Sequence, residues 1–166
     1  MSAVTELLTQ PLLRTWSMNA DYGRQLAADL SDDQMVAQPH AGINHPAWLL
    51  SHLNLYQQVL AALLRGETPA DPIDHKFGMK SAPVADASKY AAKDDLIAAW
   101  TAGHEAVASA LQSADEALLL SPMPIERFRS RFATIGSCLM FIMIRHESLH
   151  LGQLSAWRRA MELPRV

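Results

Sequence analysis

Two histidines four residues apart, His146 and His150, form the strongest chemical signal in the sequence. Residues at this spacing share one face of a helix, with Cβ atoms about 5–6 Å apart, so both imidazoles can reach one metal ion. Zinc–nitrogen bonds of about 2.0–2.1 Å require such convergence. The pair falls on the apolar stripe of its segment and is therefore expected to point inward. Two ordinary core histidines held by hydrogen bonds are the alternative.

A third histidine, His52, lies in the middle of the apolar stripe of another segment. Alone, it would be interpreted as a core residue. Three inward histidines in one small protein share a simpler explanation, because each neutral ring can donate a lone pair to one cation and so compensate its burial. Three protein ligands also leave a position for water or substrate, as in catalytic sites. The sequence therefore predicts a divalent metal site of His52, His146 and His150.

Three further side chains have the chemistry of metal ligands. His75 lies in a long connection and is an alternative fourth ligand. His104 lies on the stripe of a third segment, where we expect it in the core or behind the metal ligands rather than on the ion. Cys138 precedes His146 by eight residues, or about 12 Å along a helix, so it is expected to pack in the core.

The run from His146 to His150 also matches H-E-x-x-H, the pattern in which zinc metalloproteases use the glutamate as a general base. The extended pattern requires a glycine and a third histidine at fixed places downstream. Here Gly152 stands one residue early and Ala156 occupies the next required position. We therefore expect Glu147 to be a rim or salt-bridging residue beside Arg145, not a base.

Four segments show the apolar periodicity of amphipathic helices, and these must position the histidines. They cover residues 5–30, 46–65, 93–113 and 134–161. No segment shows the alternation of apolar and polar residues that is typical of a strand. The sequence predicts an all-α protein, an antiparallel four-helix bundle that forms a single domain over residues 1–166. A long connection joins the second and third helices.

Local signals define the ends of these helices. Pro46 suits a first helical turn and disfavours helical geometry at His45, so Asn44 or His45 is the expected cap. Gly66 is a plausible stop for the same helix. Thr134 is expected to cap the fourth helix.

Composition narrows the class of protein. Hydrophobic residues make up 49% of the chain, which suits a folded core, and the net charge of −3 offers no basic surplus for nucleic acid or an anionic membrane. The longest apolar run, Cys138 to Ile144, is far shorter than the roughly 20 residues that span a bilayer. One cysteine excludes an intrachain disulfide, and the first residues lack signal-peptide features. We expect a cytoplasmic protein.

Two stretches resemble the DinB-like family of metal-binding four-helix bundles. Residues 44–53, NHPAWLLSHL, resemble its second-helix motif, in which a histidine follows a tryptophan-containing apolar turn. Residues 145–154, RHESLHLGQL, resemble its fourth-helix motif, H-x-x-x-H-x-G-Q-L. The resemblance implies that His52, His146 and His150 bind a divalent ion, often zinc or nickel. Many members are homodimers, so we also expect a homodimer here. Related bundles include transferases and isomerases in which the metal activates a low-molecular-weight thiol.

Two residues near the histidines, Tyr56 and Gln153, have two interpretations each. Tyr56 lies one turn after His52 and either faces the metal pocket as a donor or acid, or packs with its hydroxyl at the rim. Gln153 lies about two turns from His146 and either orients a ligand or bonds to a neighbouring helix. Gly152 is expected to permit a close approach of helices.

Three functional classes follow. The first is a metal-dependent enzyme that acts on a small molecule, as a hydrolase or a low-molecular-weight-thiol transferase. The second is a non-catalytic metal-binding module or a stress-related interaction module. The third is a purely structural bundle with histidines in its core. The enzyme requires an open position on the ion, whereas the binding module predicts that a further group closes it.

Overall fold

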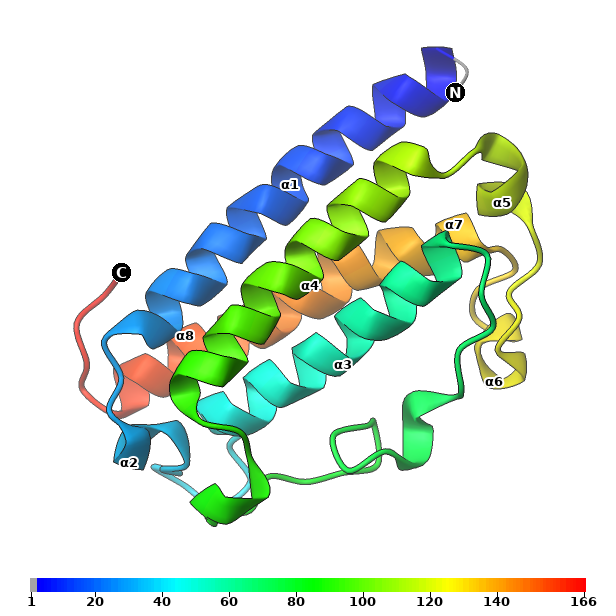
Figure 1. The fold of residues 1–166 in the computed structure, drawn as a ribbon. Helices are drawn as coiled ribbons and strands as arrows, with labels where there is room; N and C mark the ends of the chain where they lie inside the picture. Colours follow the sequence, from blue (N-terminus) through cyan, green and yellow to red (C-terminus); the bar gives the residue numbers. More distant parts are fainter. Residues whose placement is uncertain (1–2) are drawn as a thin grey trace.

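A computed structural model describes the backbone of residues 3–166 and the side chains of residues 6, 7 and 9–166 (Figure 1). This part of the chain is helical, and its only bridge pairing is an isolated one between Pro122 and Thr134. The prediction of an all-α protein is confirmed.

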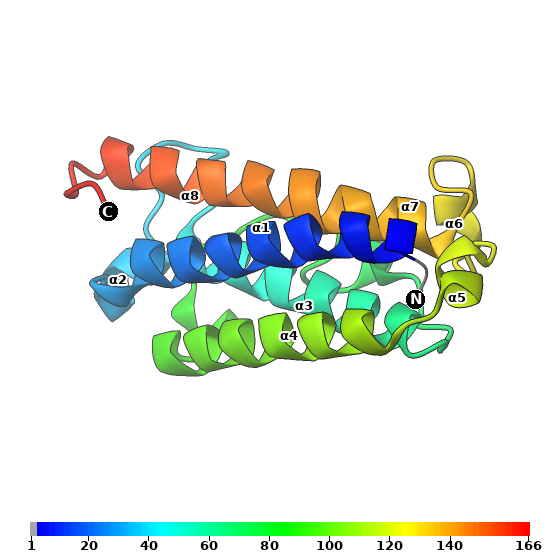
Figure 2. The ribbon, with the colours of Figure 1, turned by 90° about the horizontal axis from the view of Figure 1, so that it is seen from above.

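Four long helical runs lie side by side (Figures 1 and 2). The first three are α1 (Ala3–Ala28), α3 (Pro46–Leu64) and α4 (Lys93–Ser113). The fourth run consists of α7 (Ile135–Met140), the π-helical segment η3 (Phe141–His146) and α8 (Glu147–Ala160). Shorter elements lie in the connections: α2 (Asp32–Met35), η1 (Pro72–Asp74), η2 (Ala87–Lys89), α5 (Glu116–Leu120) and α6 (Glu126–Arg129).

Hydrogen bonds between the runs define their relative directions. Trp16 Nε1 on α1 donates to the His104 carbonyl on α4, and Trp100 Nε1 donates back to the Ala20 carbonyl. Residue numbers therefore rise on one helix as they fall on the other, so α1 and α4 are antiparallel.

The second and third long helices run in the same direction, which differs from the uniformly antiparallel order that we expected. Asn54 donates to the Leu96 carbonyl, and Gln57 Nε2 lies 2.9 Å from His104 Nδ1. The reason is the connection of residues 65–92, which returns the chain to the end of the molecule where α3 began (Figure 1). A short turn would have forced an antiparallel pair.

The cap of α3 is His45, and its side chain is fully buried. Its Nδ1 accepts a hydrogen bond from the Trp48 backbone at 3.2 Å, and its Nε2 donates to the Val84 carbonyl at 3.0 Å. A histidine can do both because its neutral ring carries one donor and one acceptor. His45, one of the two expected caps, therefore also joins the start of α3 to the long connection. Thr134 caps α7 as predicted.

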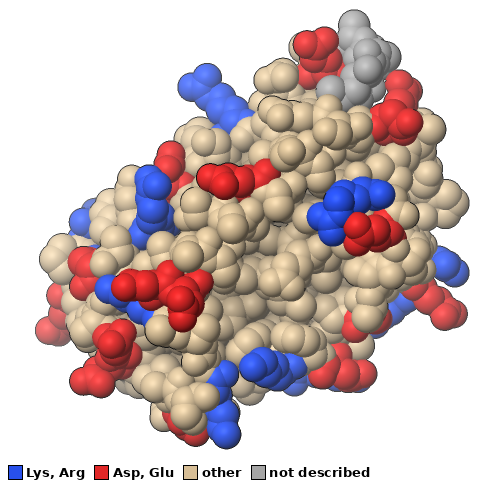
Figure 3. All heavy atoms as spheres, viewed as in Figure 1, with Lys and Arg blue, Asp and Glu red and all other residues tan. Residues whose placement is uncertain are grey.

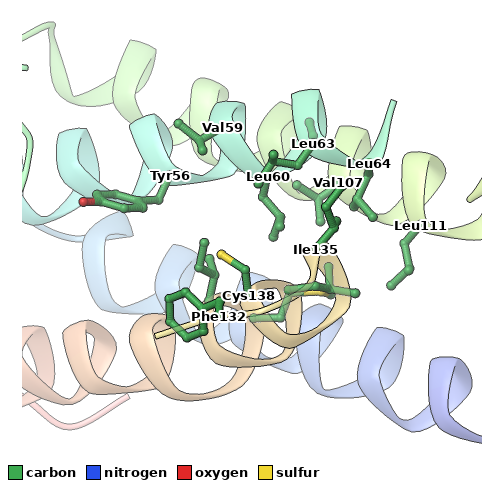
Figure 4. Close-up of a cluster of buried hydrophobic side chains, with 14 of the residues drawn as sticks. Tyr56, Val59, Leu60, Leu63, Leu64, Val107, Leu111, Phe132, Ile135 and Cys138 are labelled. Atoms are coloured by element: carbon green, nitrogen blue, oxygen red, sulfur yellow. The ribbon is translucent and has the colours of Figure 1, made fainter. Parts of the chain in front are cut away.

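The core consists of two apolar clusters with buried polar side chains between them along the helices. One cluster includes Leu60, Val107 and Cys138, and Figure 4 shows Tyr56 at its edge with the hydroxyl pointing away from the aliphatic side chains. The other includes Trp100 and Leu151. Buried polar side chains that fall between them along the helices include His52, Gln57, His104 and Glu147. This layer contains one candidate metal ligand, His52, whereas His146 and His150 are half-buried beside it.

Charged side chains of both signs are scattered over the face drawn in Figure 3, with broad uncharged areas between them. This pattern suits the small net charge of the chain. None of the helices in the described part of the chain combines the length with the hydropathy that a membrane-spanning helix needs.

Close helix approach occurs at Gly23 on α1, not at Gly152 as we expected. A Cβ built at Gly23 would lie 2.5 Å from Cζ2 of Trp100, whereas one built at Gly152 meets nothing within 4 Å. Gly152 is exposed on the outer face of α8. The tryptophan of α4 therefore fits against α1 only because position 23 has no side chain.

We expect Gly23→Ala to lower the free energy of unfolding by about 1–3 kcal/mol, because the added methyl overpacks Trp100. Gly152→Ala is the matched control, and it should raise the same quantity by about 0.5–1 kcal/mol through helix propensity alone. Urea unfolding of both variants measures the difference. Equal stabilisation by the two substitutions would contradict this packing.

Candidate metal centre

Three histidines from two helical runs converge on one point. His52 Nε2 on α3 lies 3.1 Å from His146 Nε2 at the end of η3, and one ring nitrogen from each of His52, His146 and His150 lies within 4.8 Å of the others. Nitrogen ligands of a tetrahedral zinc ion lie roughly 3.3 Å apart, since each bond is about 2.0–2.1 Å. The cluster is therefore compatible with metal binding after small ring rotations.

In two of the rings, those of His52 and His150, a hydrogen bond to a group outside the cluster shows which nitrogen faces inward. His52 Nδ1 donates to the Phe77 carbonyl at 2.7 Å, and His150 Nδ1 donates to Gln153 Oε1 at 2.9 Å. A carbonyl oxygen only accepts, so both protons are on Nδ1 and both Nε2 atoms keep a lone pair. Metal-bound histidines show this same arrangement, in which the second ring nitrogen donates to an oxygen.

The long connection of residues 65–92 supplies one of these partners. Besides Phe77, it provides Ser81, whose Oγ accepts a hydrogen bond from Trp48 Nε1 at 3.1 Å. The Val84 carbonyl binds His45 in the same way. The connection therefore runs along the first turns of α3 and holds the ring of His52 in place.

Burial keeps the three rings neutral. Desolvation, followed by repulsion from the neighbouring histidines, lowers the pKa of His146 to about 2 and that of His52 to about 4. Burial also lowers the pKa of His150. Neutral imidazoles are the form that binds metal ions.

The ring of His146 shows that hydrogen bonds alone do not compensate the burial. Its Nδ1 is buried and has no hydrogen-bond partner among the described residues. Its Nε2 faces His52, and the ring centroid of His150 lies 4.7 Å away. A cation between the three rings would meet Nε2 and not Nδ1, so the fit to a divalent ion rests on the three converging ring nitrogens.

The neighbouring Glu147 points the other way and is almost completely buried, with 1% of its surface exposed. His104 Nε2 lies 3.1 Å from its carboxylate, and burial raises the pKa of Glu147. The expected rim position beside Arg145 is therefore wrong, since a histidine on α4 compensates the buried carboxylate. Glu147 does not line the cavity beside the histidines, so the structure gives no support to a protease base.

His104 itself is held in the core and does not reach the three-histidine cluster. Its ring contacts those of Trp16 and Trp100, with centroids 4.2 Å from each. Its connection to the cluster runs through Glu147, the residue after His146. His104 thus supports the helix that carries a candidate ligand.

The remaining candidates fall in different places. Gln153 bonds His150 and also accepts from Asn44 Nδ2 at 3.2 Å, so it both orients a candidate ligand and reaches a neighbouring segment. His75 is exposed and outside the cluster, and its Nδ1 accepts from the Phe77 backbone. Cys138 is buried in the core, where desolvation raises its pKa to about 12.

The π-helical segment before His146 was not predicted. Such segments leave backbone groups unpaired and occur often at functional sites. Here Asn19 Nδ2 on α1 donates to the Met143 carbonyl at 3.3 Å. Nothing in the residue pattern of 141–146 signals the change in helical register.

A cavity of about 340 Å³ opens beside the three histidines. Its volume falls within the range of small-molecule sites. A larger and shallower hollow of about 630 Å³ near Leu64 and Leu118 contains no histidine. Apart from the three histidines, the lining residues of the smaller cavity are Trp48, Tyr56, Met79, Arg127, Phe128, Ser130, Arg131, Phe132, Phe141 and Ile142.

Fold and site together describe an all-helical protein with a three-histidine cluster beside a small-molecule cavity. Residues 16–154 match the model of the DinB superfamily, so the chain belongs to this superfamily. The match includes all three histidines and both motifs on which the resemblance was based. No curated protein matches the chain significantly.

We expect Gln153→Ala to weaken zinc binding by about 10–100-fold, because His150 loses the partner that orients its ring. Gln58→Ala, at an exposed position on α3, is the matched control and should leave the affinity unchanged. Competition with a chromophoric chelator measures both. An unchanged affinity in Gln153→Ala would show that this hydrogen bond does not orient a ligand.

Proposed function

We propose that His52, His146 and His150 bind one divalent ion, zinc or nickel, and that the chain is a metal-dependent enzyme that transfers a low-molecular-weight thiol. The observation that carries the proposal is the convergence of three neutral rings, two of them with Nδ1 bonded to an oxygen. Imidazole nitrogen is a suitable ligand for both metals. The alternative is that His52 and His146 simply share a hydrogen bond, but this would not explain why His150 lies beside them.

The cavity supports an ion that is accessible to a substrate. Within the described residues, no fourth histidine, cysteine or carboxylate joins the cluster. His75, the alternative fourth ligand, is bonded elsewhere. Three ligands and an adjoining cavity are typical of catalytic rather than structural sites, which favours an enzyme over a binding module.

The lining of the cavity favours thiol transfer over hydrolysis. When bound, a divalent ion would lower the pKa of a thiol and so favour the reactive thiolate. Among the described residues, no aspartate or glutamate lines the cavity to accept a proton from water. A free thiol, with a pKa of about 8.5, needs far less assistance than water to lose its proton.

Tyr56 is positioned to act as a hydrogen-bond donor to the substrate. Its ring lies against those of His52 and His146, with centroids 4.7 Å from each, and it lines the cavity. Burial raises the pKa of its hydroxyl, which therefore stays protonated at neutral pH. Such a donor can stabilise negative charge on a leaving group.

The cellular setting remains a proposal drawn from the resemblance and the composition. We propose a homodimer that acts in the cytoplasm on a small-molecule substrate, without nucleic acid or membrane as a partner. Light scattering of the purified chain tests the dimer.

Metal analysis tests the proposed ligands in protein purified without a histidine tag. We expect about one equivalent of zinc or nickel in the native chain and a sharp loss in His146→Ala. His75→Ala, which alters an exposed histidine outside the cluster, is the control and should keep its metal. Chelation should lower the melting temperature, since the ion stabilises only the folded state. Full metal content in His146→Ala would refute the proposed ligands.

A further inference from the structure

We propose that the cavity selects a small oxyanion, a carboxylate or phosphate carried on an apolar body, and that Arg131 binds its charge. This inference rests on the proposed function, because it names the class of substrate that the same site would take. It is carried by the charges and hydrogen-bonding groups of the cavity lining.

The charged lining beyond the histidines is positive. Arg127 and Arg131 present guanidinium groups and Tyr56 presents a hydroxyl, while the Ser130 hydroxyl donates to the Arg127 carbonyl. No carboxylate lies among the lining residues to balance them. Three neutral histidines would also leave the charge of a bound divalent ion unbalanced. A ligand rich in acceptors and negative charge is therefore favoured.

Arg127 is already paired. Its Nε and Nη2 lie 2.7 Å from the two carboxylate oxygens of Asp71, and its guanidinium lies over the Phe128 ring at 4.5 Å. This bidentate pair joins α6 to the long connection and fixes one wall of the cavity. Asp71 balances the charge of Arg127, so this arginine shapes the cavity more than it attracts a ligand.

Arg131 carries the unbalanced charge of the lining. It forms no ion pair with any residue in the described part of the chain, and its side chain is exposed at the cavity. Its backbone position is fixed, because Arg131 N and Phe132 N both donate to the Phe128 carbonyl, at 3.0 and 2.8 Å. An exposed guanidinium on a fixed turn can bind a planar oxyanion with two parallel hydrogen bonds.

Arg129, between the other two arginines, serves a different purpose. Its guanidinium donates to the carbonyls of Met123 and Pro124 and does not line the cavity. Two of the three arginines are therefore paired, Arg127 with Asp71 and Arg129 with backbone carbonyls. The side chain of Arg131 has no partner among the described residues.

The rest of the lining is apolar and largely aromatic. Trp48 stacks on His52 at 4.8 Å between centroids, and Phe132 and Phe141 contact each other at 4.9 Å. These rings and Ile142 form walls that suit a flat or branched apolar group. A cavity of about 340 Å³ holds one such group together with a small anion.

The test titrates the zinc-loaded full chain with phenylacetate, phenyl phosphate and the uncharged phenylacetamide, using ligand-observed NMR. We expect both anions to bind more tightly than the amide. Arg131→Gln should weaken the anions about tenfold and leave the amide unchanged, because one charge-assisted contact is lost. Arg131→Lys should retain part of the affinity. Arg159→Gln, which removes an exposed charge on α8 away from the cavity, is the control and should leave the affinity for the anions unchanged.

The proposal would be overturned if the anions and the amide bound equally, or if neither anion bound. It would also be overturned if Arg131→Gln left the affinity for the anions unchanged. The stronger of the two anions identifies the oxyanion, and either order supports the inference. Zinc content measured on the same samples separates this proposal from the metal site. Loss of affinity in Arg131→Gln after chelation would support the anion site even if no zinc binds.

Discussion

The burial of three neutral imidazoles at one point is the constraint on which the site depends. The protein compensates the outer nitrogens of His52 and His150 with oxygens from Phe77 and Gln153, whereas the Nδ1 of His146 is buried with no partner among the described residues. The inner nitrogens are left facing one another. Lone pairs that converge in a largely desolvated site are unfavourable without a cation, and the cluster is compatible with a divalent ion between the rings.

On the helical run that carries His146, two adjacent side chains point into different surroundings. His146 faces the cavity, while Glu147 enters the core and meets His104, whose ring contacts two tryptophans. A buried carboxylate paired in this way is costly to displace, because removal of one partner leaves an uncompensated polar group. The π-helical segment, whose Met143 carbonyl accepts a hydrogen bond from Asn19, lies directly before these two residues.

Helical periodicity was sufficient to predict that the three histidines point inward and that four long segments are helical. The reason is that side chains three and four residues apart on a helix share a face. It could not predict the Phe77 carbonyl, because a backbone oxygen in a loop has no residue-type signal. The burial of Glu147 was missed because its partner lies 43 positions away on another helix. The parallel direction of α3 and α4 depends on how the connection of residues 65–92 crosses the molecule. The length of this connection indicated that it was unusual but not which way it runs.

X-ray absorption spectroscopy of the zinc-loaded chain, purified without a tag, tests the metal centre most directly. Three imidazole nitrogens at about 2.0–2.1 Å from zinc are predicted, with the remaining coordination from light atoms that the protein does not provide. A sulfur atom at about 2.3 Å would implicate Cys138, the one cysteine of the chain. That result, or a spectrum with a single imidazole, would contradict the account.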